Sequence, residues 1–290
     1  MKEKVKCKVC HLKMDKDLDI CPFCGAKQSE IIEEKKEIIV DDKKEIKDKH
    51  LEFIARSKAL SFSNIKHLVL ILIGTIGLTF AQLIFQGIVL SAGGQDYLNS
   101  SEGLGIAVFC AYALVFLGFI LFLFRDNIKI FKLFISEYKT YLFGLCFGIL
   151  LLVTSIILNL IISRLGFVQN ENQNSALELV ATFPFLSFIV LGIIGPVVEE
   201  LTYRVGLFGL IRKYNRLASF LVTALLFALI HFDFSSVSTT SSLANELINI
   251  PSYFISGIIL CFAYEKYGIS GCIIAHMFNN CIAVISYMII

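Results

Sequence analysis

Charged side chains are scarce through most of this sequence. Residues 1–60 hold 15 of the 26 lysines and arginines and 13 of the 24 aspartates and glutamates, which leaves 11 of each kind for the next 230 residues. The net charge of +2 is too small to indicate a nucleic-acid partner, and we expect none. A cleavable signal peptide is also missing, because the first long apolar run begins near residue 65 and is too long for one; we expect it to be an anchor.

Apolar side chains fill the part of the sequence that lacks charge. The chain is 56% hydrophobic with a mean hydropathy of +0.75, whereas soluble domains are roughly 45–50% apolar. Because a bilayer crossing takes roughly 20 apolar residues, the sequence predicts an all-α polytopic membrane protein with about seven transmembrane helices. We expect these helices near residues 66–91, 103–124, 141–163, 183–211, 217–233, 249–264 and 269–289.

Basic residues are distributed unevenly between the predicted loops. Loops 92–102 and 234–248 contain no lysine or arginine, and loop 164–182 contains only Arg164. Because basic loops face the cytoplasm, we expect a cytoplasmic N-terminus and an interfacial segment at residues 128–139. The basic residues of segment 125–140 and of the turn after the fourth span are Arg125, Lys129, Lys132, Lys139, Arg212, Lys213 and Arg216.

Four of the nine cysteines lie in the polar head, where Cys7, Cys10, Cys21 and Cys24 form a C-x2-C-x10-C-x2-C pattern. Two such turns can aim four thiolates at one tetrahedral Zn²⁺. A reducing cytoplasm favours this interpretation over the alternatives, disulfides or free thiols. About 25 residues cannot bury a useful core, so the metal would supply most of the folding free energy. We therefore predict a small cytoplasmic zinc ribbon, similar to the knuckles at many protein N-termini, that could bind a protein partner.

The composition divides the chain into four parts. The zinc ribbon is expected over residues 1–27 and a charged linker over residues 28–64. The N-terminal transmembrane helices and the interfacial segment would occupy residues 65–139. Residues 140–290 would form a transmembrane domain that carries nearly all the polar side chains within the apolar spans.

Those polar side chains are few, and each ionisable one costs several kcal/mol at membrane depth unless it is paired or meets water. They are therefore candidate functional residues. They comprise Glu199, Glu200 and Arg204 in the fourth span, His231 at the end of the fifth, and His276, Asn279 and Asn280 in the seventh.

Helical spacing separates the roles of these residues. Glu200 and Arg204 are four residues apart with the acid first, so we expect them to form an ion pair on one face. Glu199 points about 100° away around the helix and has no such partner in its own span. His276 and Asn280 are also four residues apart and share a face of the seventh helix.

The expected depth of these residues in the membrane predicts that four of them can meet. Counting 1.5 Å per residue from the predicted cytoplasmic ends places Glu199, His231 and Asn280 roughly 16–21 Å deep and His276 about 10 Å deep. A carboxylate, two imidazoles and a carboxamide in one cavity would suit activation of water and stabilisation of an oxyanion. The alternative for each residue is a hydrogen bond that links helices. Asn279 lies off the face that His276 and Asn280 share, and we interpret it as a packing or polar-contact residue. We place three histidines in the soluble segments, outside the membrane spans and without comparable neighbours: His11, His50 and His67.

Several intramembrane protease motifs are absent. There is no H-E-x-x-H of the site-2 zinc type and no pair of transmembrane aspartates. GISG at residues 268–271 resembles the rhomboid serine motif, but no histidine follows on a later helix, so we interpret Ser270 as a turn residue.

The remaining polar residues resemble the CAAX protease and bacteriocin-processing family, also called CPBP or Abi. Its motifs E-E-x-x-x-R, F-x-x-x-H and H-x-x-x-N occur here in order as EELTYR, FALIH and HMFNN. The resemblance covers roughly residues 140–290. One departure is Val205 directly after the arginine, where family members often have glycine; here Gly206 follows it.

This resemblance implies proteolysis within the membrane. By carry-over, Glu199 with His231 would activate the attacking water, His276 and Asn280 would stabilise the oxyanion, and the EELTYR ion pair would hold the helix in place. A competing scheme has Glu199, His231 and His276 bind a catalytic divalent metal. The sequence alone leaves both schemes open.

We therefore predict an intramembrane endopeptidase that acts on a membrane-associated protein or peptide. Eukaryotic relatives trim prenylated termini, whereas bacterial ones are associated with bacteriocin maturation or self-immunity. A zinc ribbon on such a body is typical of bacteria, so we expect a bacterial plasma membrane and no prenyl group. Two alternatives remain open, a catalytically silent immunity or scaffold protein and a proton-coupled transporter, since buried Glu and His also form proton relays.

Overall fold

The computed structural model describes residues 4–7, 9, 12–22, 24–27, 44, 45, 47–49, 52–54, 60–128, 130 and 138–289. The chain divides into two compact units, Met1–Leu51 and Glu52–Ile290. Cys10, His11 and His50 lie outside the described residues, as do most of the linker and most of the interfacial segment expected at residues 128–139.

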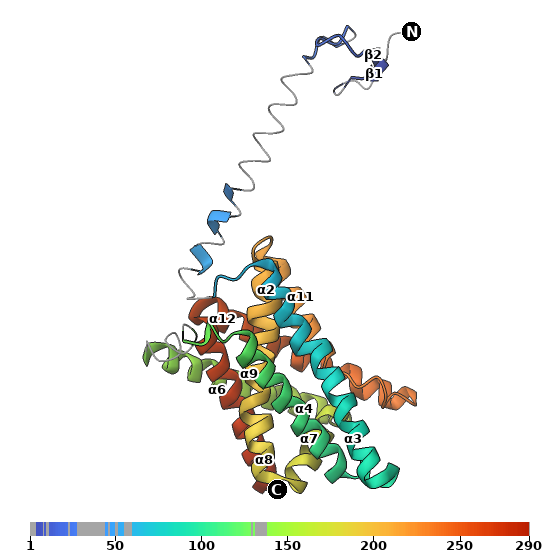
Figure 1. Cartoon of the computed structure of the whole chain (residues 1–290), viewed down its shortest axis with the longest axis vertical. Coiled ribbons are helices and arrows are strands. Elements are labelled where there is room, and N and C mark those ends of the chain that lie inside the picture. The colour runs from blue at the N-terminus through green and yellow to red at the C-terminus, as the bar shows by residue number, and fades with distance from the viewer. Residues whose placement is uncertain are drawn as a thin grey trace. The chain divides into compact units, whose positions relative to one another are not determined.

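The first unit begins with a short hairpin that positions cysteine. Strands β1 (Lys4–Lys6) and β2 (Lys13–Asp15) pair antiparallel (Figure 1). Cys7 follows β1 directly, and its backbone N–H donates to the Leu12 carbonyl at 2.8 Å. A second turn places the Cys21 N–H 2.9 Å from the Ala26 carbonyl, with Gly25 at a φ of 72°. The left-handed position after Cys24 is therefore occupied by the residue that tolerates it best.

The described residues of the second unit are predominantly helical, which confirms the prediction of an all-α polytopic membrane protein. Apolar runs and few interior prolines favour helix, and helices satisfy every backbone polar group in lipid. In chain order (Figure 1), the elements are α2 (Asn64–Leu72), η1 (Ile73–Gly77), α3 (Leu78–Leu98), α4 (Ser101–Phe122), α6 (Tyr138–Arg164), α7 (Glu171–Thr182), α8 (Pro184–Ile189), η2 (Val190–Ile194), α9 (Gly195–Glu199), η3 (Glu200–Phe208), α10 (Gly209–Arg212), α11 (Arg216–Leu229) and α12 (Thr240–Ile289).

Five described helical stretches are long and apolar enough to cross a membrane: Asn64–Leu98, Ser101–Phe122, Lys139–Arg164, Pro184–Arg212 and Thr240–Ile289. The shorter α11 corresponds to the fifth predicted span. The last stretch breaks at Gly268, which has a φ of 68° and lies where the sixth and seventh predicted spans adjoin. The count of seven spans stays a prediction.

The stretch Pro184–Arg212 has the largest buried share of the five, with half of its apolar window buried. It carries the acidic residues, so burial on several sides separates them from lipid. Helix α2 and the adjoining η1 pack against its η3 section, where a Cβ on Gly74 of η1 would lie 1.7 Å from Thr202 Oγ1. Only glycine permits this close approach of the two helices.

The segment expected to be loop 164–182 contains a helix instead. The Asn170 side chain caps α7 by accepting the Gln173 N–H at 3.3 Å, and Leu179 and Val180 are buried. The helix packs against α4 and α12. A 12-residue helix shorter than a membrane crossing explains why counting apolar spans did not find it.

His67 was placed with the histidines outside the membrane spans, and this was wrong. The residue lies inside α2 and is 1% exposed. Its Nδ1 is 2.7 Å from the Val205 carbonyl, directly after the arginine of EELTYR. The imidazole therefore links α2 to η3, which satisfies a polar group that the apolar surroundings would otherwise penalise.

Candidate active site

The central helix changes its winding where the acidic pair stands. Glu199 ends α9, and Glu200 begins η3, whose turns are wider than those of an α-helix. Such widened turns occur frequently at functional sites. The Glu200 side chain is fully buried, whereas that of Glu199 is 16% exposed. The two adjacent carboxylates therefore have different surroundings.

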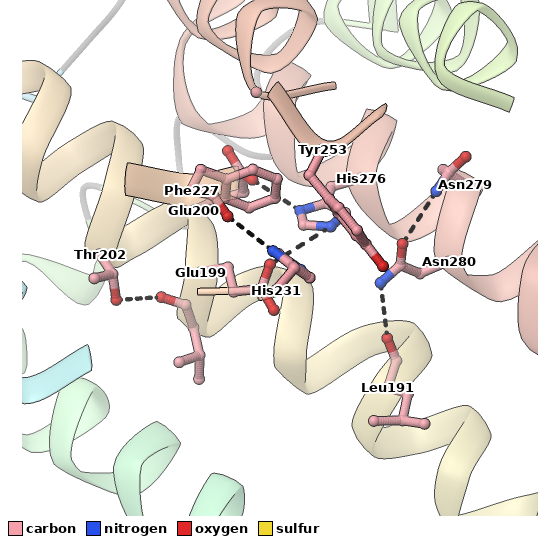
Figure 2. Close-up of polar contacts among 12 residues, drawn as sticks. Leu191, Glu199, Glu200, Thr202, Phe227, His231, Tyr253, His276, Asn279 and Asn280 are labelled. Carbon is pink, nitrogen blue, oxygen red and sulfur yellow. Dashed lines mark hydrogen bonds and ion pairs between the residues drawn. The ribbon is translucent and has the colours of Figure 1, made fainter. Parts of the chain in front are cut away.

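Glu200 forms the centre of a buried polar cluster. Its Oε1 lies 3.2 Å from Arg204 Nη1, which confirms the predicted ion pair. The same oxygen lies 2.8 Å from His276 Nδ1, a contact that sequence analysis did not predict (Figure 2). Because an ionised carboxylate can only accept, His276 Nδ1 donates to it. Glu200 therefore orients the His276 imidazole of the seventh predicted span and also pairs with Arg204 of its own helix.

Arg204 joins three helices at this point. Its Nη2 donates to the Gly257 carbonyl of α12 at 3.5 Å, and its guanidinium carbon lies 4.4 Å from the centre of the Phe227 ring of α11. Phe227 is the first residue of the FALIH motif. The aromatic face and the carboxylate together stabilise the buried cation.

His231 is held in place from three sides. Its Nδ1 lies 2.8 Å from the Phe227 carbonyl, so Nδ1 carries a proton and Nε2 can accept. Its ring stacks on Tyr253 of α12 with centroids 4.2 Å apart and planes 16° apart (Figure 2). Its backbone carbonyl accepts a hydrogen bond from Asn170 Nδ2 at 2.9 Å.

Asn280 is fixed by two amide contacts. Its Nδ2 donates to the Leu191 carbonyl of η2 at 3.1 Å, and its Oδ1 accepts from Asn279 Nδ2 at 3.2 Å (Figure 2). An Nδ2 group has two hydrogens, so one remains after the bond to Leu191. Asn279 makes the kind of polar contact that was expected of it.

A polar network beside His231 was missed by sequence analysis. The Tyr253 hydroxyl donates to Asn170 Oδ1 at 3.1 Å and accepts from Asn172 Nδ2 at 3.2 Å and, more distantly, from Gln173 Nε2 at 3.4 Å. The run NENQN at residues 170–174, next to an apolar span, was the available signal. It was interpreted only as part of a loop.

Glu199, His231, His276 and Asn280 all line one cavity of about 180 Å³, as their depths predicted. Within it, Glu199 Oε2 lies 3.7 Å from His276 Nε2. A second cavity of about 320 Å³ is also lined by Glu199, His231 and Asn280. The geometry brings the four groups together, and their catalytic roles stay predictions.

The cysteines of the head form a separate cluster. The ligand atoms of Cys7, Cys21 and Cys24 lie within 4.8 Å of one another and could hold a metal ion. The sulfurs of Cys7 and Cys24 are 3.7 Å apart, and the Val9 N–H points to the Cys7 sulfur at 3.4 Å. Two thiolates at 2.3 Å from a tetrahedral zinc would lie about 3.8 Å apart, so the cluster fits this ion. Cys10, the fourth predicted ligand, lies outside the described residues.

Within the part of the chain that the structure describes, this cysteine cluster is the one group of three or more potential ligands with all ligand atoms within 4.8 Å. Glu199, His231 and His276 do not meet that spacing. The cavity groups therefore stand around an open space rather than closing on one point.

The family model described as Type II CAAX prenyl endopeptidase Rce1-like matches residues 181–282. This interval contains all three motifs, EELTYR, FALIH and HMFNN. The match confirms the resemblance to the CPBP family, over a shorter interval than the expected residues 140–290. Comparisons with curated proteins and with solved structures give no significant match.

Proposed function

We propose that this chain, whose residues 181–282 carry an Rce1-like domain of the CPBP family, is an intramembrane endopeptidase. In this proposal it hydrolyses a peptide bond of a membrane-associated protein or peptide. The observation that carries the proposal is the cavity that Glu199, His231, His276 and Asn280 line inside a body of apolar helices. Apolar surroundings strengthen each electrostatic interaction in such a site.

Glu199 is the proposed general base. Its Oε2 is buried and makes no hydrogen bond to the described residues, so it is available to a water molecule in the cavity. The carboxylate takes a proton from this water as the water oxygen attacks the carbonyl carbon of the scissile bond. His231 supports the same water through Nε2, because its Nδ1 is engaged by the Phe227 carbonyl.

His276 and Asn280 stabilise the oxyanion of the tetrahedral intermediate in this proposal. Asn280 offers its second Nδ2 hydrogen, while the first is donated to the Leu191 carbonyl. His276 donates from Nε2 in its imidazolium form, with Glu200 at Nδ1. The carbon–nitrogen bond then breaks, and the proton taken up by Glu199 passes to the leaving nitrogen.

A metal-dependent version of the same function is the second candidate. In both imidazoles Nδ1 faces a fixed acceptor, which leaves Nε2 free in the way that metal-ligating histidines commonly show. A divalent ion held by Glu199, His231 and His276 would supply Lewis acidity for the peptide carbonyl. Its binding would require side-chain movement, because these three side chains are not among the described groups that stand close enough to hold an ion.

We further propose that the head is a zinc ribbon in which Cys7, Cys10, Cys21 and Cys24 bind a structural Zn²⁺ and whose surface binds a protein partner. The close spacing of three of these cysteines supports this proposal. The basic loops support a cytoplasmic N-terminus, and the fusion of ribbon and membrane body supports a bacterial plasma membrane.

The first test compares protein termini in membranes of cells that express the wild type, Glu199→Gln or Glu102→Gln. Glu102 is an exposed carboxylate at the start of α4 and serves as the matched control. We expect new termini with the wild type and with Glu102→Gln, and none with Glu199→Gln. Identical termini in all three would remove the proposal and favour the silent scaffold. Metal analysis of the purified wild type and Glu199→Gln then separates the two catalytic schemes.

A further inference from the structure

We propose that the two cavities beside Glu199 are the arms of one substrate site, and that it takes an extended peptide segment which changes from polar to apolar near the cleaved bond. This inference rests on the proposed function, because it takes Glu199 as the point of cleavage. The cavity of about 180 Å³ is called the polar arm, and that of about 320 Å³ the apolar arm.

The two arms meet at Glu199. Both are lined by the same five residues, Asn172, Gln173, Glu199, His231 and Asn280. A peptide that occupies both arms must therefore pass the carboxylate and the carboxamide assigned to bond cleavage. The larger arm alone reaches the size of a typical ligand pocket, roughly 300 Å³ or more.

The polar arm lies between α6 and α12. Its distinctive polar lining includes Ser155 and Asn159 from α6 and Ser252 and Ser256 from α12, and the apolar side chains of Leu151, Phe227 and Leu260 also line it. The Ser252 hydroxyl is buried and has no hydrogen-bond partner among the described residues. Buried polar atoms normally have a partner, so this one indicates a group supplied from outside. Short hydroxyl and amide side chains suit a peptide backbone with small polar side chains.

The apolar arm is the more apolar of the two, although Gln82 and Ser175 also line it. Its walls come from α4, α7, η2 and the end of α12, and most of the side chains that set it apart are hydrocarbon or aromatic. Burial of apolar surface against them favours an apolar flank of the substrate. The distinctive lining includes Val108, Tyr112, Leu179, Leu191, Val284 and Tyr287.

Gln173 stands where the arms join. Its Oε1 is buried and accepts no hydrogen bond from the described residues, while its Nε2 lies 3.4 Å from the Tyr253 hydroxyl. A carboxamide oxygen in this state can accept a backbone N–H of the substrate. The contact would fix the peptide next to Glu199 without requiring any particular side chain.

The proposed contact with Gln173 constrains the conformation of the substrate. The backbone N–H groups of a helix already donate within the helix, so a segment that donates one to Gln173 must be extended at this point. A sequence that passes from the bilayer into water has both the required polarity change and a local end of its helix.

Photocrosslinking tests the two arms separately. The probes are two synthetic peptides of one sequence, with an apolar half of Leu, Val and Ala and a polar half of Ser, Asn and Gly. Each is made once with the apolar half at the N-terminus and once with it at the C-terminus. One carries a diazirine amino acid in the apolar half and the other carries it in the polar half. Each is irradiated with full-length Glu199→Gln protein in detergent, and the labelled residues are found by mass spectrometry.

We expect the apolar probe to label residues such as Val108 and Val284, and the polar probe to label Ser252 or Ser256. The inference is overturned if both probes label one arm, or if they label lipid-facing positions such as Leu121, whose exposed fraction is 64%. Gln173→Leu should reduce labelling by both probes, and undiminished labelling would remove Gln173 from the site.

Cleavage by otherwise wild-type protein supplies a second readout. Ser256→Leu should lower kcat/KM for the peptide by roughly tenfold through the polar flank. The kcat/KM of this variant should recover when the polar flank of the peptide is made apolar. Absence of recovery would count against the polar arm. If the peptide is cleaved but the two probes do not label separate arms, this inference fails and the proposed endopeptidase stands. If the probes label separate arms but the peptide is not cleaved, the proposed endopeptidase fails and the two-armed binding site stands.

Discussion

The cysteine cluster of the head and the polar cavity of the membrane body both collect side chains that bind metals, yet they space them differently. In the head, the ligand atoms of Cys7, Cys21 and Cys24 lie within 4.8 Å of one another. In the body, Glu199 and His276 approach to 3.7 Å, while the full set surrounds about 180 Å³ of space. Structural metal sites close around the ion, whereas catalytic sites keep a position open for a reactant.

The two regions also differ in what else stabilises them. The buried apolar cluster of the described head consists of Cys7, Met14 and Cys21. The body has an extensive cluster that includes Phe119, Phe208 and many other side chains. Removal of a metal-binding thiol should therefore unfold the head, whereas removal of a polar side chain from the cavity should mainly lower catalytic activity.

The largest effect is expected from Cys21→Ser. We expect the purified full-length chain to lose its bound zinc and the head to become sensitive to protease, because structural zinc contributes about 10–16 kcal/mol in zinc-finger peptides. Elemental analysis and limited proteolysis measure both changes. Cys146→Ser, at an exposed cysteine of α6, is the matched control and should retain the metal. Equal zinc in Cys21→Ser would contradict the ribbon.

Arg204→Met should produce the next largest effect. It leaves the fully buried Glu200 carboxylate without its cation, which costs about 3–5 kcal/mol of unfolding free energy. Arg216→Met removes one of the two arginine partners of Glu265, at a side chain that is 56% exposed, so we expect a loss of about 1 kcal/mol or less. Denaturant unfolding in mixed micelles compares them. Equal losses of unfolding free energy would mean that the buried Glu200–Arg204 pair stabilises the fold no more than an exposed ion pair does.

Asn280→Ala should separate chemistry from stability. Loss of one oxyanion donor lowers kcat by about 10²–10³-fold, while the melting temperature should change little because Asn280 is only partly buried. The measurement is peptide cleavage together with thermal unfolding. Asn99→Ala, at the end of α3, should leave cleavage unchanged. A large loss of stability without a change in kcat would assign Asn280 to helix packing.

Tyr253→Leu should have the smallest effect. Loss of the stacked ring removes about 0.5–1.5 kcal/mol that positions His231, so kcat should fall a few-fold with little change in KM. Tyr253→Phe keeps the ring and removes only the hydroxyl with its bonds to Asn170, Asn172 and Gln173, and it should recover most of the rate. A pH–rate profile that differs between the two variants would support positioning. Equal rates in the wild type and both variants would exclude it.

Local spacing made part of this architecture predictable. The Glu200–Arg204 pair follows from a four-residue separation on one helix, and the cysteine turns follow from C-x2-C spacing. The apolar spans follow from the thickness of the bilayer. In each case the interacting groups lie within a few residues of one another, so the sequence carries the geometry directly.

Contacts between distant segments were not predictable in this way. The bond between Glu200 and His276 joins residues 76 positions apart, and the stack of Tyr253 on His231 joins different helices. The cap at Asn170 depends on a helix that is too short to count as a span. Such contacts depend on tertiary packing, which a single sequence with simple periodicity does not specify.

Phe227 has a consequence beyond packing. One ring lies over the Arg204 guanidinium, contacts the imidazoles of His231 and His276 with centroids 5.0 and 5.9 Å away, and lines the polar arm. The ring therefore separates two environments. On one side the buried Glu200–Arg204 ion pair is kept from water, and on the other side the cavity must admit water. A smaller residue here would let solvent screen the charges whose unscreened field orients His276.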